Sequence, residues 1–152
     1  MSEEERDFAD DEDQRRPLGL VLLTGLYLFF FLVTASTFGH SFPFMGVIYE
    51  GDAAKVLVFL ESLATLYFFL GLLKRQLLTW YFLIAFNLLE IVNTIVNLAF
   101  ISVKDLERYI GRPIDSGDLL NKNLAMALAL LLLTQFIYRQ KKLFTNRAKY
   151  LF

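Results

Sequence analysis

Residues 53–102 read AAKVLVFLESLATLYFFLGLLKRQLLTWYFLIAFNLLEIVNTIVNLAFIS and hold two long apolar blocks, 53–73 and 77–102, separated only by Lys74, Arg75 and Gln76. A helix needs about 20 apolar residues to cross about 30 Å of hydrocarbon, and each block meets that length. A link of three residues leaves two such helices antiparallel and side by side. The stretch therefore predicts a membrane-spanning helical hairpin.

Two further apolar blocks flank this hairpin, at 18–38 and at 119–138. Pro17 suits the first turn of a helix, where its missing N–H costs nothing, and Asp52 and Asp118 are expected as the N-caps of the second and fourth helices. The chain is 56% hydrophobic and 16% aromatic, more than a soluble domain of 152 residues can bury. We predict an all-α membrane protein, an antiparallel four-transmembrane-helix bundle over residues 17–145.

The two ends of the chain carry opposite charge. Residues 1–16 hold eight acids against three arginines and almost no apolar side chains, so this acidic tail is expected to be disordered. Residues 139–152 form a basic segment after the last helix. The first apolar block is too long for the core of a cleaved signal peptide, so we expect it to stay as a helix.

The placement of Lys and Arg predicts the orientation of the helices, because cytoplasmic loops carry the excess of basic residues. With the N-terminus inside, ten basic residues fall on the cytoplasmic side and five fall outside. The acids beyond the tail and outside the apolar blocks all fall on the outer side. Both termini and the Lys74-Arg75 turn are therefore expected in the cytoplasm.

The two outer loops do not read as ordinary solvated linkers. Residues 39–51 are aromatic and apolar, and 103–117 hold a possible short amphipathic helix, so both are expected to lie at the membrane surface. His40 is the single histidine and the chain has no cysteine. A lone histidine without such companions predicts no metal site.

Polar side chains inside the apolar blocks are the candidate functional residues, since an ionisable group in hydrocarbon is costly unless it is paired or neutral. At a rise of 1.5 Å per residue, Glu61, Asn87 and Glu90 lie at similar depth, about 19–23 Å from the turn. We expect them within reach of each other, with at least one carboxylate protonated. The whole predicted cluster comprises Glu61, Asn87, Glu90, Asn93, Thr94 and Asn97.

Three interpretations of this cluster stay open. The side chains can fix helix packing through hydrogen bonds, they can receive a donor or cation from another subunit, or they can line a path for protons, ions or small solutes. A path would need an oligomer, because four helices are few for a pore within one chain.

The sequence contains no motif for enzyme chemistry. It has no glycine-rich phosphate loop, no cysteine nucleophile and no nucleophile elbow near a serine. We expect no catalytic residue, no cofactor and no nucleic-acid partner. The basic residues near the cytoplasmic ends are expected to meet anionic lipid headgroups; they are Lys74, Arg75, Arg139, Lys141 and Lys142.

Several short motifs resemble those of small prokaryotic four-helix membrane proteins of unknown function. They are Arg16-Pro17-Leu18-Gly19, Gly71-Leu72-Leu73-Lys74-Arg75, Thr79-Trp80-Tyr81, and Ile137-Tyr138-Arg139 through Phe144. The resemblance covers about residues 15–145. The resemblance implies a multi-pass protein of the plasma (inner) membrane, and it does not imply any particular activity.

These observations favour a non-catalytic accessory or interaction subunit of a larger membrane complex, with the lipid bilayer and a protein partner or a second copy as neighbours. The alternative is a small oligomeric transporter or channel-like protein that uses the intramembrane Glu and Asn side chains for proton, ion or small-solute passage.

Overall fold

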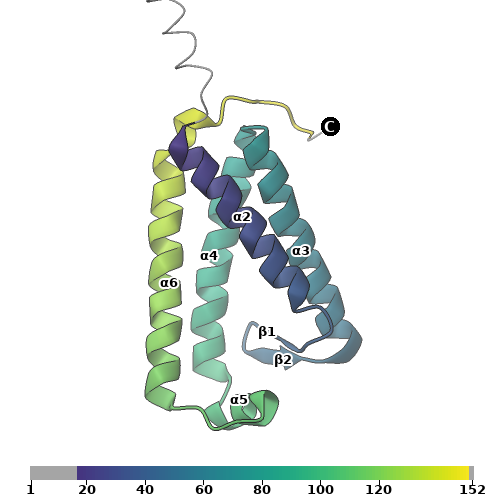
Figure 1. Ribbon diagram of the computed structural model, residues 1–152. Coiled ribbons are helices and arrows are strands. Elements are labelled where there is room, and N and C mark those ends of the chain that lie inside the picture. Colours follow the sequence, from purple (N-terminus) through teal and green to yellow (C-terminus); the bar gives the residue numbers. More distant parts are fainter. Residues whose placement is uncertain (1–16, 151–152) are drawn as a thin grey trace, which may run out of the picture.

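The computed structural model describes residues 17–150, so the predicted disorder of the tail at 1–16 lies outside the described residues. Four long helices dominate it: α2 (Leu18–Ser36), α3 (Gly51–Leu73), α4 (Leu77–Phe100) and α6 (Ser116–Arg139) (Figure 1). Each is long and apolar enough to cross a membrane, which confirms the four predicted spans at that level. The chain thus has the layout of a multi-pass membrane protein.

The ends of the helices differ from the prediction by a few residues. α2 ends at Ser36 and α4 at Phe100, each two residues earlier than expected. α3 begins at Gly51, two residues earlier, and α6 spans Ser116–Arg139, three residues longer at its start and one at its end. Helix ends are the least predictable part of a helix, because capping geometry decides them.

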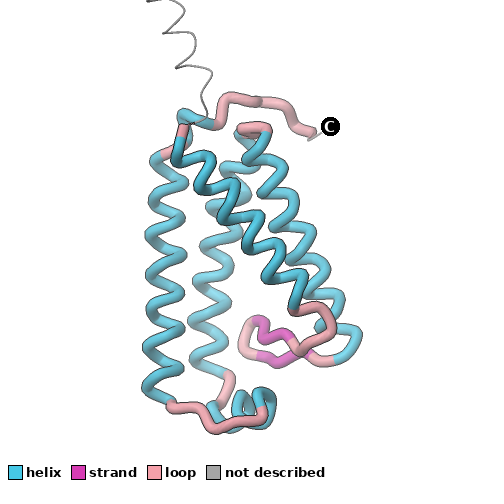
Figure 2. Tube along the Cα trace, viewed as in Figure 1, coloured by secondary structure: helices cyan, strands magenta, loops and turns pink. Residues whose placement is uncertain are grey.

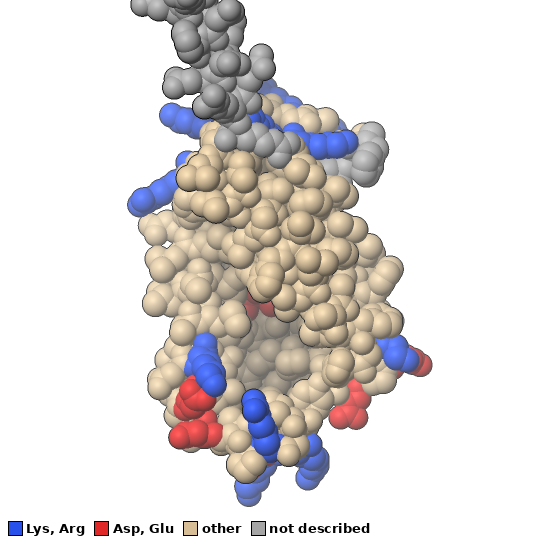
Figure 3. Space-filling view, viewed as in Figure 1, with Lys and Arg blue, Asp and Glu red and all other residues tan. Residues whose placement is uncertain are grey.

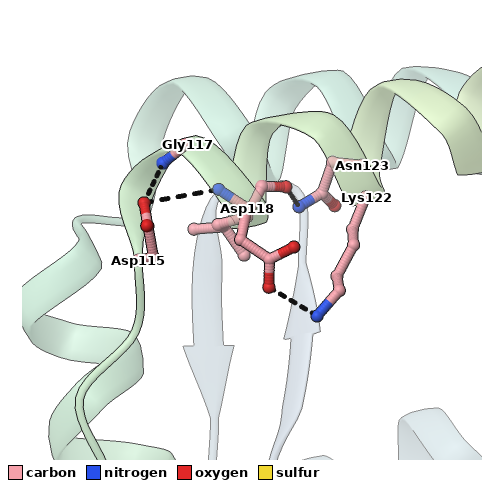
Figure 4. A network of polar contacts seen from close by, with 6 residues as sticks. Asp115, Gly117, Asp118, Lys122 and Asn123 are labelled. Atoms are coloured by element: carbon pink, nitrogen blue, oxygen red, sulfur yellow. Dashed lines mark hydrogen bonds and ion pairs between the residues drawn. The ribbon is translucent and has the colours of Figure 1, made fainter.

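Both predicted N-caps were wrong by a few positions. Asp52 and Asp118 instead lie in the first turns of α3 and α6. There the positive end of the helix dipole stabilises a negatively charged carboxylate. The N-cap of α6 is Asp115, whose Oδ1 accepts hydrogen bonds from the backbone N–H of Gly117 at 2.7 Å and of Asp118 at 3.5 Å (Figure 4). Glu50 precedes α3 in extended conformation without a capping side-chain bond.

The predicted hairpin of α3 and α4 is close only near its turn. There, Gly71 of α3 lies directly against the side chain of Thr79 of α4. Farther along, the two helices separate, and each packs more extensively on another helix, α3 on α2 and α4 on α6 (Figure 1). The two helices are thus in contact as predicted, but mainly near the turn, and strand β1 (Phe42–Phe44) contacts both of them at their far end.

The aromatic loop after α2 forms a β-hairpin that the sequence did not predict (Figure 2). β1 pairs antiparallel with β2 (Val47–Tyr49), with Phe44 opposite Val47. Met45 and Gly46 join the strands, both with positive φ, 47° and 82°. Two such residues give the tight turn whose twist matches a hairpin. The short helix α5 (Val103–Ile110) lies at the same end of the molecule.

The buried core gathers at the opposite end, near the turn between α3 and α4. Its fully buried members come from all four long helices; they include Leu20, Tyr27, Leu72, Leu83 and Ile137. After α6, a 3-10 turn (Lys141–Leu143) leads to Phe144, which is also buried in this core.

The segment after Phe144 forms hydrogen bonds to the turn between α3 and α4. The backbone N–H of Asn146 donates to the carbonyl of Arg75 at 3.0 Å, and the carbonyl of Asn146 accepts from Leu77 at 2.8 Å. The side-chain amide of Gln76 donates to the carbonyl of Ala148 at 2.9 Å. We call residues 146–148 the C-terminal strap, since they bind the turn between α3 and α4.

Candidate functional site

Glu61 of α3 and Glu90 of α4 line one cavity of about 230 Å³, where these helices separate. The other walls of this cavity, the α3–α4 cavity, are apolar; they include Phe42, Phe44, Leu57, Leu60, Ala64 and Phe86. The structure thus brings the two predicted carboxylates together, and strand β1 closes the end of the space. Acidic atoms also show at the edge of a hollow away from the two ends of the molecule (Figure 3).

These carboxylates have few partners. Oε2 of Glu61 is buried and accepts no hydrogen bond. Oε2 of Glu90 accepts one long bond, from Nδ2 of Asn93 at 3.4 Å. Within residues 17–150 the ion pairs are Lys55–Asp52 and Lys122–Asp118, both exposed, so neither glutamate is paired with a described cation. Two acids in a largely apolar cavity are an unusual and costly arrangement.

Asn87 does not join the two glutamates, contrary to expectation. Its Oδ1 accepts a hydrogen bond from the hydroxyl of Tyr27 at 2.8 Å, and both residues are almost fully buried. Asn87 therefore ties α4 to α2. Its Nδ2 is buried and has no hydrogen-bond partner.

Asn93 and Asn97 hold the β-hairpin against α4. Oδ1 of Asn93 accepts from the backbone N–H of Met45 at 2.8 Å, and Oδ1 of Asn97 accepts from that of Gly46 at 2.7 Å. Nδ2 of Asn97 donates to the carbonyl of Pro43 and to Oδ1 of Asn93, both at 3.2 Å. The two asparagines thus satisfy the backbone groups of a turn that would otherwise need water.

The hydroxyl of Thr94 donates to the carbonyl of Glu90, one turn earlier in its own helix, at 2.8 Å. It therefore makes no bond to another element. The six predicted residues therefore do not form one cluster. Glu61 and Glu90 line the cavity, Asn87 contacts α2, Asn93 and Asn97 anchor the hairpin, and Thr94 bonds within α4.

The predicted basic residues lie at the end that carries the α3–α4 turn, where the visible surface shows Lys and Arg (Figure 3). Lys74, Arg139, Lys141 and Lys142 are exposed and Arg75 is half-buried. Lys141 has a neighbour that the sequence did not predict: its ammonium lies 4.7 Å from the ring centre of Trp80 and 5.3 Å from that of Tyr81. Cation–π contacts of this kind hold Lys141 near the helix surface.

A second cavity of about 540 Å³ opens at the other end, between the hairpin and α5. Its walls mix apolar and charged side chains, among them Phe100, Glu50, Asp105 and Arg108. Sequence patterns could not reveal it, because it depends on how the hairpin and α5 are placed. Within residues 17–150 no three His, Cys, Asp or Glu side chains are grouped to hold a metal ion.

Comparisons with known proteins add no assignment: no family model, no curated protein and no solved structure matches the chain.

Proposed function

We propose that this chain is a non-catalytic accessory or interaction subunit of a larger complex in the plasma (inner) membrane of a prokaryote. Its four spans form an antiparallel bundle with both termini in the cytoplasm. The observation that carries the proposal is the anchored β-hairpin, which gives the outer end of the molecule an ordered apolar surface.

That surface is both fixed and exposed. Asn93 and Asn97 bind the turn of the hairpin through the backbone N–H of Met45 and Gly46, so the strands have a defined position on α4. Large apolar side chains remain exposed beside it; they are Val47, Phe100, Tyr109 and Ile110. An ordered apolar patch at this end of the molecule is typical of a protein interaction site.

The same contacts weaken the idea of a polar path along α4. Asn87, Asn93 and Asn97 use their side chains for bonds to α2 and to the hairpin. Their Oδ1 atoms, the groups that would coordinate a passing cation, therefore already accept hydrogen bonds. The three asparagines of the predicted cluster therefore support a structural role first.

The orientation is tested by single cysteines, because the chain contains none of its own. A cysteine in place of Ser41 or Ser116 should react with an impermeant maleimide added to intact cells. A cysteine in place of Thr145 should react only after the cells are opened. Labelling of the Thr145 variant alone in intact cells would reverse the proposed topology.

The subunit proposal is tested by purifying the tagged chain in mild detergent and measuring the protein mass by light scattering. We expect a complex of fixed stoichiometry that is larger than the 17.6 kDa chain. Replacing Val47 and Tyr109 by serine should dissociate it, whereas a serine at Leu22, on the exposed side of α2, should not. A monomer for the parent chain would refute the proposal.

A small oligomeric transporter or channel-like protein is the second candidate, and Glu61 and Glu90 in the α3–α4 cavity favour it. Carboxylates at membrane depth commonly mark ion or proton pathways. Proteoliposomes with a pH-sensitive dye inside separate the two candidates. Proton flux that is lost in Glu61→Gln but kept in Glu50→Gln would favour transport.

A further inference from the structure

We propose that the α3–α4 cavity binds a small hydrophobic organic cation, with Glu61 and Glu90 as its counter-charges. This inference concerns a pocket within one chain and does not rest on the proposed complex. It gives a chemical class to the ligand of a site that is otherwise defined only by its walls.

The apolar walls of the cavity and its two acids differ sharply in character. Nearly all the lining side chains are apolar, among them Phe42, Phe44 and Phe86. Such walls favour an apolar ligand, since burial of apolar surface drives binding. The acids demand a positive charge or a proton, because an unpaired carboxylate in apolar surroundings is costly. One ligand that is both apolar and positively charged satisfies both demands.

The two glutamate carboxylates also have unused hydrogen-bonding capacity. Oε2 of Glu61 is buried and accepts nothing, and the Glu90 carboxylate accepts only the 3.4 Å bond from Asn93. No lysine, arginine or histidine within residues 17–150 forms an ion pair with either one. A positively charged group is therefore a partner that this site can accept.

The three phenylalanines fit the same ligand. Phe42 and Phe44 of β1 are stacked with their ring centres 6.4 Å apart, and Phe86 of α4 faces the same cavity. Aromatic faces attract cations, and quaternary ammonium groups are commonly recognised by several rings together. The hairpin thus contributes part of the binding site, in addition to closing its end.

The size and position of the cavity favour a small molecule over a side chain from another helix. Its volume of about 230 Å³ lies below the range of typical drug-sized pockets. Oε2 of Glu61 is buried among groups of this chain, so a side chain from another helix would have to displace some of them to reach it. A compact ligand can enter past Leu60, whose side chain is exposed.

The test measures binding of benzyltrimethylammonium to the purified full chain in mild detergent by isothermal titration calorimetry. This probe keeps its charge at every pH, so protonation of the probe cannot change the result. Neopentylbenzene, which has the same shape without the charge, is the matched ligand. We expect saturable binding of the cation and binding of the neutral analogue that is weaker by about tenfold or more.

Glu61→Gln and Glu90→Gln should each weaken binding of the cation by about tenfold, since each removes a counter-charge and keeps the shape. Glu50→Gln, at an exposed glutamate outside the cavity, is the matched control and should bind as the parent does. Ala64→Leu fills the cavity without altering charge and should also abolish binding, which keeps the test decisive if a Gln variant fails to fold.

Equal binding of the neutral analogue, unchanged binding in both Gln variants, or no saturable binding at millimolar probe would each overturn the proposal. The cation-site proposal is tested by ligand binding, and the subunit proposal is tested by the mass of the complex. A negative binding result therefore leaves the subunit proposal unaffected.

Discussion

Replacing Tyr27 by phenylalanine removes one hydroxyl from the buried contact between α2 and α4. Tyr27 and Asn87 are 0% and 1% exposed, and the hydroxyl donates to Oδ1 of Asn87 at 2.8 Å. In Tyr27→Phe, the Asn87 side chain loses this bond, and its Nδ2 already has no partner. A complete buried amide is then left without any hydrogen bond.

The expected loss of stability follows from the free energy needed to bury a polar group without a hydrogen-bond partner. An orphaned buried partner costs about 1–3 kcal/mol in proteins generally, whereas interhelical bonds in a membrane protein average about 0.6 kcal/mol with a maximum near 1.7. We expect Tyr27→Phe to lower the free energy of unfolding by about 1–2 kcal/mol. Tyr27→Phe combined with Asn87→Leu removes every polar atom of the pair, so it should cost less than the sum of the single changes.

Reversible unfolding in mixed micelles of mild detergent and dodecyl sulfate measures these energies. Trp80 is the only tryptophan and is buried, so its fluorescence reports the transition. The double-mutant cycle should give a coupling of about 0.5–1.7 kcal/mol. Tyr138→Phe, at an exposed tyrosine, is the control and should stay within about 0.5 kcal/mol of the parent. Energies that add within about 0.3 kcal/mol would refute a direct bond.

Three further changes test other contacts. Asn97→Ala should speed amide hydrogen exchange at Gly46 without unfolding the helices, and unchanged protection there would show that Asn97 does not anchor the hairpin. Gly71→Ala should destabilise the fold by about 1–3 kcal/mol, because the added Cβ would lie 2.7 Å from Cβ of Thr79, whereas Gly25→Ala meets open space and should be neutral or stabilising. Truncation after Phe144 should lower the thermal midpoint measured by circular dichroism, since it removes the C-terminal strap; an unchanged midpoint would mean that the strap contributes nothing.

The long helices and the level of the two glutamates could be predicted because they depend on regular quantities. The apolar blocks are long enough to span hydrocarbon, and a constant rise per residue from a short turn brings Glu61 and Glu90 to similar depth. These relations need no knowledge of how the helices face each other.

The contacts of the asparagines could not be predicted, because they depend on what lies beside α4. The spacing of Asn87, Glu90, Thr94 and Asn97 puts them on one side of a helix, yet α2 reaches the first and the hairpin reaches the last. The hairpin itself gave no signal, since its Met45-Gly46 turn lacks the Asn-Gly or Asp-Gly pair that marks such turns.

The C-terminal strap also has a consequence for the order of biosynthesis. Nε2 of Gln76 donates to the carbonyl of Ala148, and the ribosome adds Ala148 72 residues after Gln76. At translation rates of 5–20 residues per second, that interval is roughly 4–14 seconds. Until residue 148 is added, Nε2 of Gln76 lacks this acceptor, whereas Oε1 of the same side chain can already accept from the hydroxyls of Tyr67 and Thr79.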